Sequence, residues 1–258
     1  MIRALYMYPL KETCTPLDVV ITILIGLAVG LLFGIFNGLM IGKFKFNYWL
    51  ITFATMSIGY GIAKIVTNGN LLAGYSKVFR FLADGNILFS TCIWWAIIIV
   101  IIASIILKKK RLGYGIYAIG DNEQCAANSG IDVGKTRFMV YTISGMLAGL
   151  GGVLLVSKTN SASSAQNGYE FNAIAAVVVG GTSLDGGRGS ISGTIVGAVI
   201  IQAVKSGLQL IGLNAYWQQT LIGVFILTII IIDVLNGEKV KTKLLRRIYK
   251  TSADTKED

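Results

Sequence analysis

The longest polar passage of the chain is GYGIYAIGDNEQCAANSGIDVGKTR, residues 113–137. Two apolar blocks flank it, TCIWWAIIIVIIASIIL at 91–107 and FMVYTISGMLAGLGGVLLV at 138–156. A buried loop of this length would leave many polar groups without hydrogen-bond partners, so we expect the passage to lie in water. The flanking blocks are typical of membrane spans, and the passage between them is therefore predicted to be a long loop outside the bilayer.

The centre of this passage, residues 121–130, is predicted to form a short amphipathic helix. Asp121 can cap its start, Glu123 sits in the first turn near the positive end of the helix dipole, and Gly130 can close its end. The small side chains of Ala126 and Ala127 can fit into a groove on a partner. A capped, water-exposed helix between two spans is a surface on which another protein can dock.

The composition is that of a polytopic membrane protein. Of 258 residues, 54% are hydrophobic and 14% are charged, whereas soluble domains carry about 25% charged residues. The chain has 31 glycines, which are common in membrane spans, and 0 histidines, which excludes Ser-His chemistry and the commonest metal ligand. The 3 scattered cysteines form neither a disulfide framework nor a zinc pattern. We therefore predict no catalytic residue, no metal and no cofactor, and a protein that is not an enzyme.

Apolar segments of about the length that crosses a bilayer recur along the chain. We expect spans at 18–41, 48–67, 87–107, 138–156, 191–210 and 217–232, with a polar loop at 68–86. The apolar block 173–179 is too short to cross alone and runs into GGTSLDGGRGS, residues 180–190, which predicts a broken or re-entrant element. The fold class predicted is all-α, a polytopic bundle of about six to seven transmembrane or re-entrant helices with one cytoplasmic helix.

The distribution of basic residues predicts the orientation. We treat residues 1–258 as one transmembrane domain with N-terminal spans at 18–107, a polar loop at 108–137, C-terminal spans at 138–235 and a tail at 236–258. Most of the 23 basic residues fall in the turn after the first span, in the polar loop and in the tail. The positive-inside rule places these segments, and hence the C-terminus, in the cytoplasm. It also explains the net charge of +10 without a nucleic-acid partner.

Two glycine ladders predict close helix packing. Glycines recur every four residues in the first span, and a second ladder follows the glycine-rich break; the packing positions are Gly26, Gly30, Gly34, Gly38, Gly42, Gly189, Gly193 and Gly197. At helical spacing such residues form a smooth stripe along which a neighbouring helix approaches closely. Asn37 sits beside the first stripe, where it can hydrogen-bond across helices or line a substrate path.

The glycine-rich break itself allows two interpretations. Its members are Gly180, Gly181, Asp185, Gly186, Gly187, Arg188 and Gly189. The favoured interpretation is that the glycines turn the chain sharply between two packed helices, and the alternative is an anion-holding backbone nest. VGKT at 133–136 is not a phosphate loop, because Ser129 stands where that motif requires glycine.

Two passages together resemble a known family. They are YAIGDNEQCAANSGI at 117–131 and GYEFNAIAAVVVGGTSLDGGRGSISGTIVGAVI at 168–200, and in this order they are similar to permease subunits of bacterial ATP-binding-cassette sugar importers of the ribose, xylose and galactose type. The resemblance implies a multi-pass subunit of the bacterial plasma membrane that carries a ribose-like pentose or a hexose. It also implies cytoplasmic ATPase subunits, a second permease copy or paralogue, and an extracellular or periplasmic sugar-binding protein as partners, within membrane lipid.

By the same resemblance the ATPase-coupling residues are Asp121, Asn122, Glu123, Ala126, Ala127 and Gly130. The chain departs from the family in the spacing of Glu and Ala in EQCAANSG, residues 123–130, and in lacking further N-terminal hydrophobic segments, so we expect it to be shortened there.

Two alternative functions stay open at this point. One is a stand-alone channel or secondary transporter, for which Lys64, Lys205 and Asp233 are the available ionisable span residues. The other is a truncated remnant that binds partners without transporting. The sequence does not name the sugar, and Asn37, Asn172, Gln202 and Gln209 are candidates for lining its path.

Overall fold

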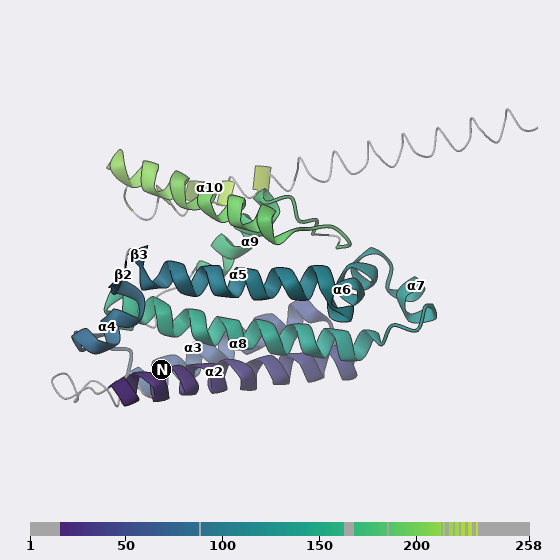
Figure 1. Cartoon of the computed structure of the whole chain (residues 1–258), viewed down its shortest axis with the longest axis horizontal. Coiled ribbons are helices and arrows are strands. Elements are labelled where there is room, and N and C mark those ends of the chain that lie inside the picture. The colour runs from purple at the N-terminus through teal and green to yellow at the C-terminus, as the bar shows by residue number, and fades with distance from the viewer. Residues whose placement is uncertain are drawn as a thin grey trace, which may run out of the picture. The chain divides into compact units, whose positions relative to one another are not determined.

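A computed structural model gives the chain an almost entirely helical fold (Figure 1). The structure describes residues 16–87, 89–162, 168–184, 186–212, 214 and scattered positions between 217 and 231. The chain divides into two compact units, residues 1–167 and 168–258, which we describe separately. The division into N-terminal spans, polar loop, C-terminal spans and tail stays a prediction.

Unit 1 contains the long helices α2 (Pro16–Gly38), α3 (Tyr48–Thr67), α5 (Thr91–Lys109) and α8 (Val133–Thr159). A π-helical turn, η1 (Leu39–Lys43), continues α2, and three shorter helices, α4 (Lys77–Asp84), α6 (Arg111–Asp121) and α7 (Glu123–Asn128), join the long ones. Four two-residue strands, β1 (Leu72–Ala73), β2 (Asn86–Ile87), β3 (Phe89–Ser90) and β4 (Ser161–Ala162), form two small antiparallel pairs, β1 with β4 and β2 with β3. Unit 2 contains α9 (Tyr169–Val179) and α10 (Ile191–Leu210).

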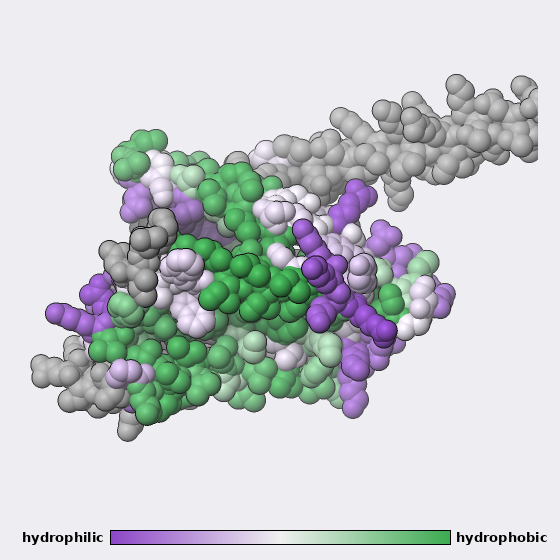
Figure 2. All heavy atoms as spheres, viewed as in Figure 1, coloured by the Kyte–Doolittle hydropathy of each residue, from purple (hydrophilic) through white to green (hydrophobic). Residues whose placement is uncertain are grey.

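Five helices of the described residues are long and apolar enough to cross a membrane: Pro16–Lys43, Tyr48–Thr67, Thr91–Lys109, Val133–Thr159 and Ile191–Leu210. The predicted all-α, polytopic fold is thereby confirmed. In Figure 2 hydrophobic side chains cover the middle of unit 1 and hydrophilic ones gather toward its ends, as a lipid environment requires. The predicted span 217–232 lies largely outside the described residues.

Several predicted boundaries differ from the structure: the first span, expected at 18–41, is Pro16–Lys43, and the third, expected at 87–107, is α5 at Thr91–Lys109. The spans 48–67 and 191–210 have the bounds of α3 and α10, but α8 begins five residues before the expected 138. The reason is a cap: Lys135 N donates a hydrogen bond of 2.9 Å to the Asp132 side chain, so the helix starts in the polar loop. The expected loop 68–86 also contains α4, whose buried face holds Phe79 and Ala83.

The glycine stripe of α2 lies against α8, and the two helices run antiparallel, side by side in Figure 1. A Cβ atom added to Gly34 would lie 2.8 Å from Tyr141 O and 2.9 Å from Thr142 O. Equivalent backbone contacts join Gly30 to Gly145 and Gly149, and Gly42 to Gly134. Because α8 also has glycines at these contacts, the two backbones meet without side chains between them.

The opposite end of unit 1 from the polar loop is closed by α4. The Ser157 hydroxyl of α8 donates a hydrogen bond of 2.8 Å to Phe79 O, and both residues are buried. On the surface, Lys158 Nζ lies 2.7 Å from Asp84 Oδ1. The hydrogen bond and charge of Lys158 hold the pKa of the Asp84 carboxyl below its ordinary value. These contacts tie the end of α8 to the loop between α3 and α5.

Candidate functional site

The helix expected within residues 121–130 is present as α7, but its cap is Asn122 rather than Asp121. Asn122 is extended (φ −154°), and its side chain accepts a hydrogen bond of 3.0 Å from Cys125 N. Asp121 is instead the last residue of α6. Gly130 follows the helix with φ of +82°, a conformation that favours glycine, and Ile131 N donates to Ala126 O at 3.1 Å. The short helix is therefore capped at its start by Asn122 and closed at its end by the turn at Gly130.

Of the two alanines on α7, only one is available to a partner. Ala126 is 3% exposed and packs within unit 1, whereas Ala127 is exposed, as are Glu123, Gln124 and Cys125. The expectation that both alanines could enter a partner's groove is therefore wrong for Ala126. Its role is to hold α7 on the unit, and the outer face is formed by Ala127 and its exposed neighbours.

An ion pair connects α7 to the first turns of α8. Arg137 Nη2 lies 2.7 Å from Glu123 Oε2, and both side chains are partly exposed. Arg137 precedes Tyr141 by one helical turn, and Tyr141 lines a pocket between the spans. The sequence predicted Glu123 in the first turn of the helix. It did not predict the partner Arg137, which lies 14 residues further along the chain and outside any local pattern.

The preceding helix, α6, was not predicted. It carries Gly113 and Gly115, which disfavour helix in isolation. Both glycines are buried: a Cβ on Gly113 would lie 2.6 Å from the Leu107 carbonyl carbon, and one on Gly115 would touch Thr136 at 3.4 Å. Packing on the ends of α5 and α8 thus outweighs propensity. The sequence feature that is compatible with a helix here is the absence of proline over 111–121.

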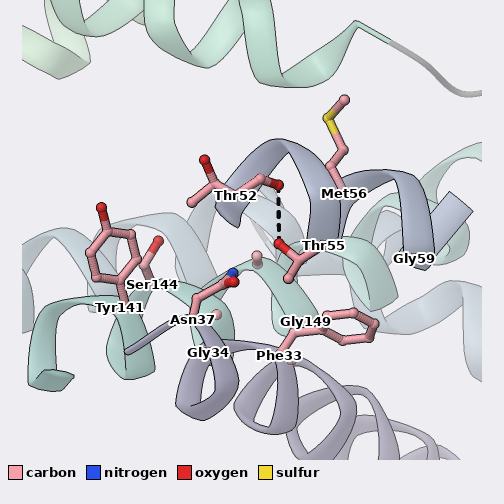
Figure 3. A pocket seen from close by; sticks show the side chains of 13 residues that line it. Phe33, Gly34, Asn37, Thr52, Thr55, Met56, Gly59, Tyr141, Ser144 and Gly149 are labelled. Atoms are coloured by element: carbon pink, nitrogen blue, oxygen red, sulfur yellow. Dashed lines mark hydrogen bonds between the residues drawn. The ribbon is translucent and has the colours of Figure 1, made fainter. Parts of the chain in front are cut away.

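A pocket of about 430 Å³ opens between α2, α3 and α8 (Figure 3). Its polar side chains are Asn37, Thr52, Thr55, Tyr141 and Ser144, and Phe33 and Met56 add apolar surface. The glycines Gly30, Gly34, Gly145 and Gly149 form part of the wall, at the close backbone contact between α2 and α8. Of these residues, the sequence pointed to Asn37 for a substrate path and to Gly30 and Gly34 as packing positions; the pocket lining from α3 was not predicted.

The Asn37 side chain stands out within this pocket. Its Oδ1 atom is buried and has no hydrogen-bond partner among the described residues. The hydroxyls of Thr52 and Thr55, by contrast, donate to backbone carbonyls of their own helix, at 2.7 Å to Tyr48 O and 3.0 Å to Ile51 O. A buried carbonyl without a donor is costly, so this group calls for a partner that the chain itself does not supply among the described residues.

Unit 2 holds the predicted broken element as a helical hairpin. The 11 residues of α9 rise only about 16 Å, half of a bilayer core. A Cβ on Gly180 would lie 2.7 Å from Thr194 N, and one on Gly197 would lie 2.8 Å from Gly180 N, so α9 and α10 pack antiparallel. Gly193 contacts Gly180, and Gly189 contacts Thr182. The second ladder therefore lies between these two helices.

The break between α9 and α10 is a compact turn. Gly181, Gly186 and Gly187 have φ of +84°, +94° and +71°, and Ser183 N donates to Arg188 O at 3.1 Å. Ser190 then caps α10 by accepting from Gly193 N at 3.1 Å. This geometry supports the turn interpretation of the glycines. Asp185 lies outside the described residues.

The basic residues of unit 1 gather at the end that carries α7. This end holds Lys43 and Lys45 at and just after the end of η1, Lys108 to Arg111 across the end of α5 and the start of α6, and Lys135 and Arg137 at the start of α8. The opposite end has Lys64 in the last turn of α3, together with Lys77, Arg80 and Lys158; Arg80 and Lys158 pair with Asp84. No group of three or more potential metal ligands occurs among the described side chains.

Comparison with known proteins gives consistent matches. The family described as branched-chain amino acid transport system / permease component matches residues 1–230. The ribose import permease protein of Bacillus subtilis (strain 168) is 38% identical over 229 residues, 84% of this chain and 68% of the relative.

Two proteins of Escherichia coli (strain K12) also match. The ribose import permease protein is 35% identical over 222 residues, 84% of this chain and 69% of the relative. The galactose/methyl galactoside import permease protein is 33% identical over 234 residues, which are 87% of this chain and 70% of the relative. No solved structure gave a significant match.

Proposed function

Because the chain belongs to the family of branched-chain amino acid transport system permease components, we propose that it is the permease subunit of an ATP-driven sugar importer. The carrying observation is the alignment of 84% or more of the chain with the ribose and galactose import permeases compared above. The chain is thus a transporter component and not an enzyme. Its substrate in this proposal is a monosaccharide, a ribose-like pentose or a hexose.

The alternatives left open by the sequence gain no support from these relatives, which are all import permeases. A stand-alone transporter would need ionisable groups deep in the spans. Lys64 is exposed near the end of α3, and Asp233 lies outside the described residues. Lys64 therefore offers no coupling site in the middle of a span, and among the described residues Lys205 of α10 would have to serve.

The proposal assigns ATPase docking to the outer face of α7. This helix is water-exposed, capped at both ends and held to unit 1 by Ala126 and by the Glu123–Arg137 ion pair. A rigid surface loses little conformational entropy on binding, which favours a stable contact. A cytoplasmic ATPase is the occupant proposed here, and a second permease copy and a sugar-binding protein complete the importer.

The proposed orientation places the α7 end and the C-terminal tail in the cytoplasm of a bacterial cell. The basic residues at that end of unit 1 support it through the positive-inside rule. In a variant with Cys14 and Cys92 replaced by serine, Cys125 on α7 is expected to react with an impermeant maleimide only after cell lysis.

A matched variant tests the other side. Ser161→Cys on β4, with Cys125 also replaced by serine, is expected to react on intact cells, because β4 lies at the α4 end of unit 1. The reverse pattern, with position 125 labelled on intact cells and position 161 protected, would overturn the orientation.

The family and transport assignment is tested by purification of the full chain with its ATPase. Co-expression of the permease with a tagged ATPase and a sugar-binding protein is expected to yield a complex that contains the permease. The permease recovered alone, with no ATPase under mild detergent, would count against the proposed function.

A further inference from the structure

We propose that the pocket between α2, α3 and α8 is a sugar-contact site on the translocation path, with Asn37 hydrogen-bonding the hydroxyls of a neutral monosaccharide. The inference rests on the proposed transport function and adds to it a location and a recognition chemistry. Every element that forms the pocket belongs to unit 1 and is described by the structure. Its volume of about 430 Å³ lies within the ~300–1,000 Å³ of small-molecule sites.

The hydrogen-bonding groups suit a polyhydroxyl ligand. Asn37 Oδ1 is a buried acceptor that has no donor among the described residues, and an amide also supplies two N–H donors. The Thr52 and Thr55 hydroxyls use their protons on backbone carbonyls, so toward the pocket they act as acceptors. In Figure 3 the Asn37 amide lies at the centre of the view, between these threonines and the Tyr141 and Ser144 side chains of α8. A ligand rich in O–H donors meets these acceptors.

The absence of charge argues against an ionic ligand. Among the 13 described residues that line the pocket there is no Asp, Glu, Lys or Arg. A zwitterionic amino acid would bring an ammonium and a carboxylate into this site without counter-charges, at a large desolvation cost. A neutral sugar has no such cost, and Phe33 and Met56 can cover its C–H face. The pocket chemistry therefore selects a neutral polyol over an amino acid.

The location also suits coupling. Tyr141 lines the pocket one turn along α8 from Arg137, which pairs with Glu123 of α7. The pocket wall itself is the glycine contact between α2 and α8, where a small displacement changes the space because no side chains lie between the backbones. A shift of α8 driven from α7 would thus alter the site directly.

The transport arm of the test uses Asn37→Leu, which keeps the number of side-chain heavy atoms and removes the polar ones. In proteoliposomes with the complete importer, uptake of D-ribose or methyl galactoside is expected to fall about tenfold, the effect of losing one hydrogen bond to a ligand. The Tm of the purified permease is expected to stay equal or rise, because the unpartnered carbonyl is gone. A merely structural asparagine would instead give a lower Tm.

The matched control is Thr22→Val on α2. Its hydroxyl donates to Asp18 O at 2.8 Å and lies outside the pocket, so uptake is expected to match the parent protein. Full uptake in the Asn37→Leu importer would overturn the inference while leaving the proposed function intact. Absence of uptake in the parent importer would instead contradict the proposed function.

A binding arm stands independently of transport. Ser144→Cys, in a variant whose three cysteines are replaced by serine, places a thiol in the pocket. Millimolar D-ribose or methyl galactoside is expected to slow its reaction with a small thiol reagent, whereas betaine at equal osmolarity is not. Equal labelling rates with and without sugar would overturn the inference. So would a thiol blocked throughout, the result expected if lipid or a second permease copy fills the space.

Discussion

Replacement of Ala127 by arginine is expected to abolish ATPase binding while leaving the permease folded and inserted. Ala127 is exposed on α7, so the free protein tolerates a larger side chain there. In the proposed complex the arginine would be buried at the contact without a partner, which typically lowers affinity about a hundredfold or more. Copurification with the tagged ATPase and sugar-stimulated ATP hydrolysis measure the loss.

Two further variants separate docking from folding. Ala126→Arg is expected to lower the yield of the permease itself, because Ala126 is only 3% exposed within unit 1. Glu123→Ala is expected to weaken ATPase binding less than Ala127→Arg, since it removes a partly exposed ion pair with Arg137 and a favourable charge at the helix start. If Ala127→Arg keeps full ATPase binding and full uptake, the docking assignment is wrong.

Replacement of Gly34 by leucine is expected to give the largest loss of folded protein. A Cβ at this position would lie 2.8 Å from Tyr141 O and 2.9 Å from Thr142 O, both backbone atoms that cannot move aside. The helices α2 and α8 would have to separate, and overpacking of this kind costs about 1–3 kcal/mol or more. Yield after membrane extraction and Tm are the measurements, because Gly34 also lines the pocket and uptake alone would not isolate packing.

The control for this substitution is Gly151→Leu on α8. A Cβ at Gly151 has nothing within 4 Å, so the same change on that face is expected to leave yield and Tm close to the parent values. An equal Tm for the Gly34→Leu and Gly151→Leu proteins would contradict the packing described for the α2–α8 contact.

The spans and the packing stripe could be predicted because their signals are local. The bounds of α3 and α10 follow from apolar runs that end at residues such as Asn47, Asn68 and Ser190, which cap helices. The four-residue glycine period of α2 has the helical repeat, and it pointed to a close neighbour without naming α8. A short apolar block followed by glycines was enough to predict a broken or re-entrant element, which the structure forms as the α9–α10 hairpin.

The features that the sequence did not predict depend on contacts between residues far apart in the chain. Helix α6 exists in spite of Gly113 and Gly115, because they pack on α5 and α8. Asn122 rather than the predicted Asp121 caps α7, because the extended backbone at Asn122 lets its side chain accept the hydrogen bond from Cys125 N. The pocket joins Asn37 to Thr55 and Tyr141 across three helices, and no spacing along one helix reveals such a set.

The central claim is that this chain carries a sugar across the membrane as the permease of an ATP-driven importer. The most direct measurement reconstitutes the full chain with its ATPase and binding protein in proteoliposomes and follows labelled D-ribose and methyl galactoside. We predict uptake of at least one of these sugars that requires ATP on the α7 side and is lost in the Ala127→Arg importer. Uptake that proceeds without ATP, or no uptake of either sugar by a correctly assembled complex, would contradict the account.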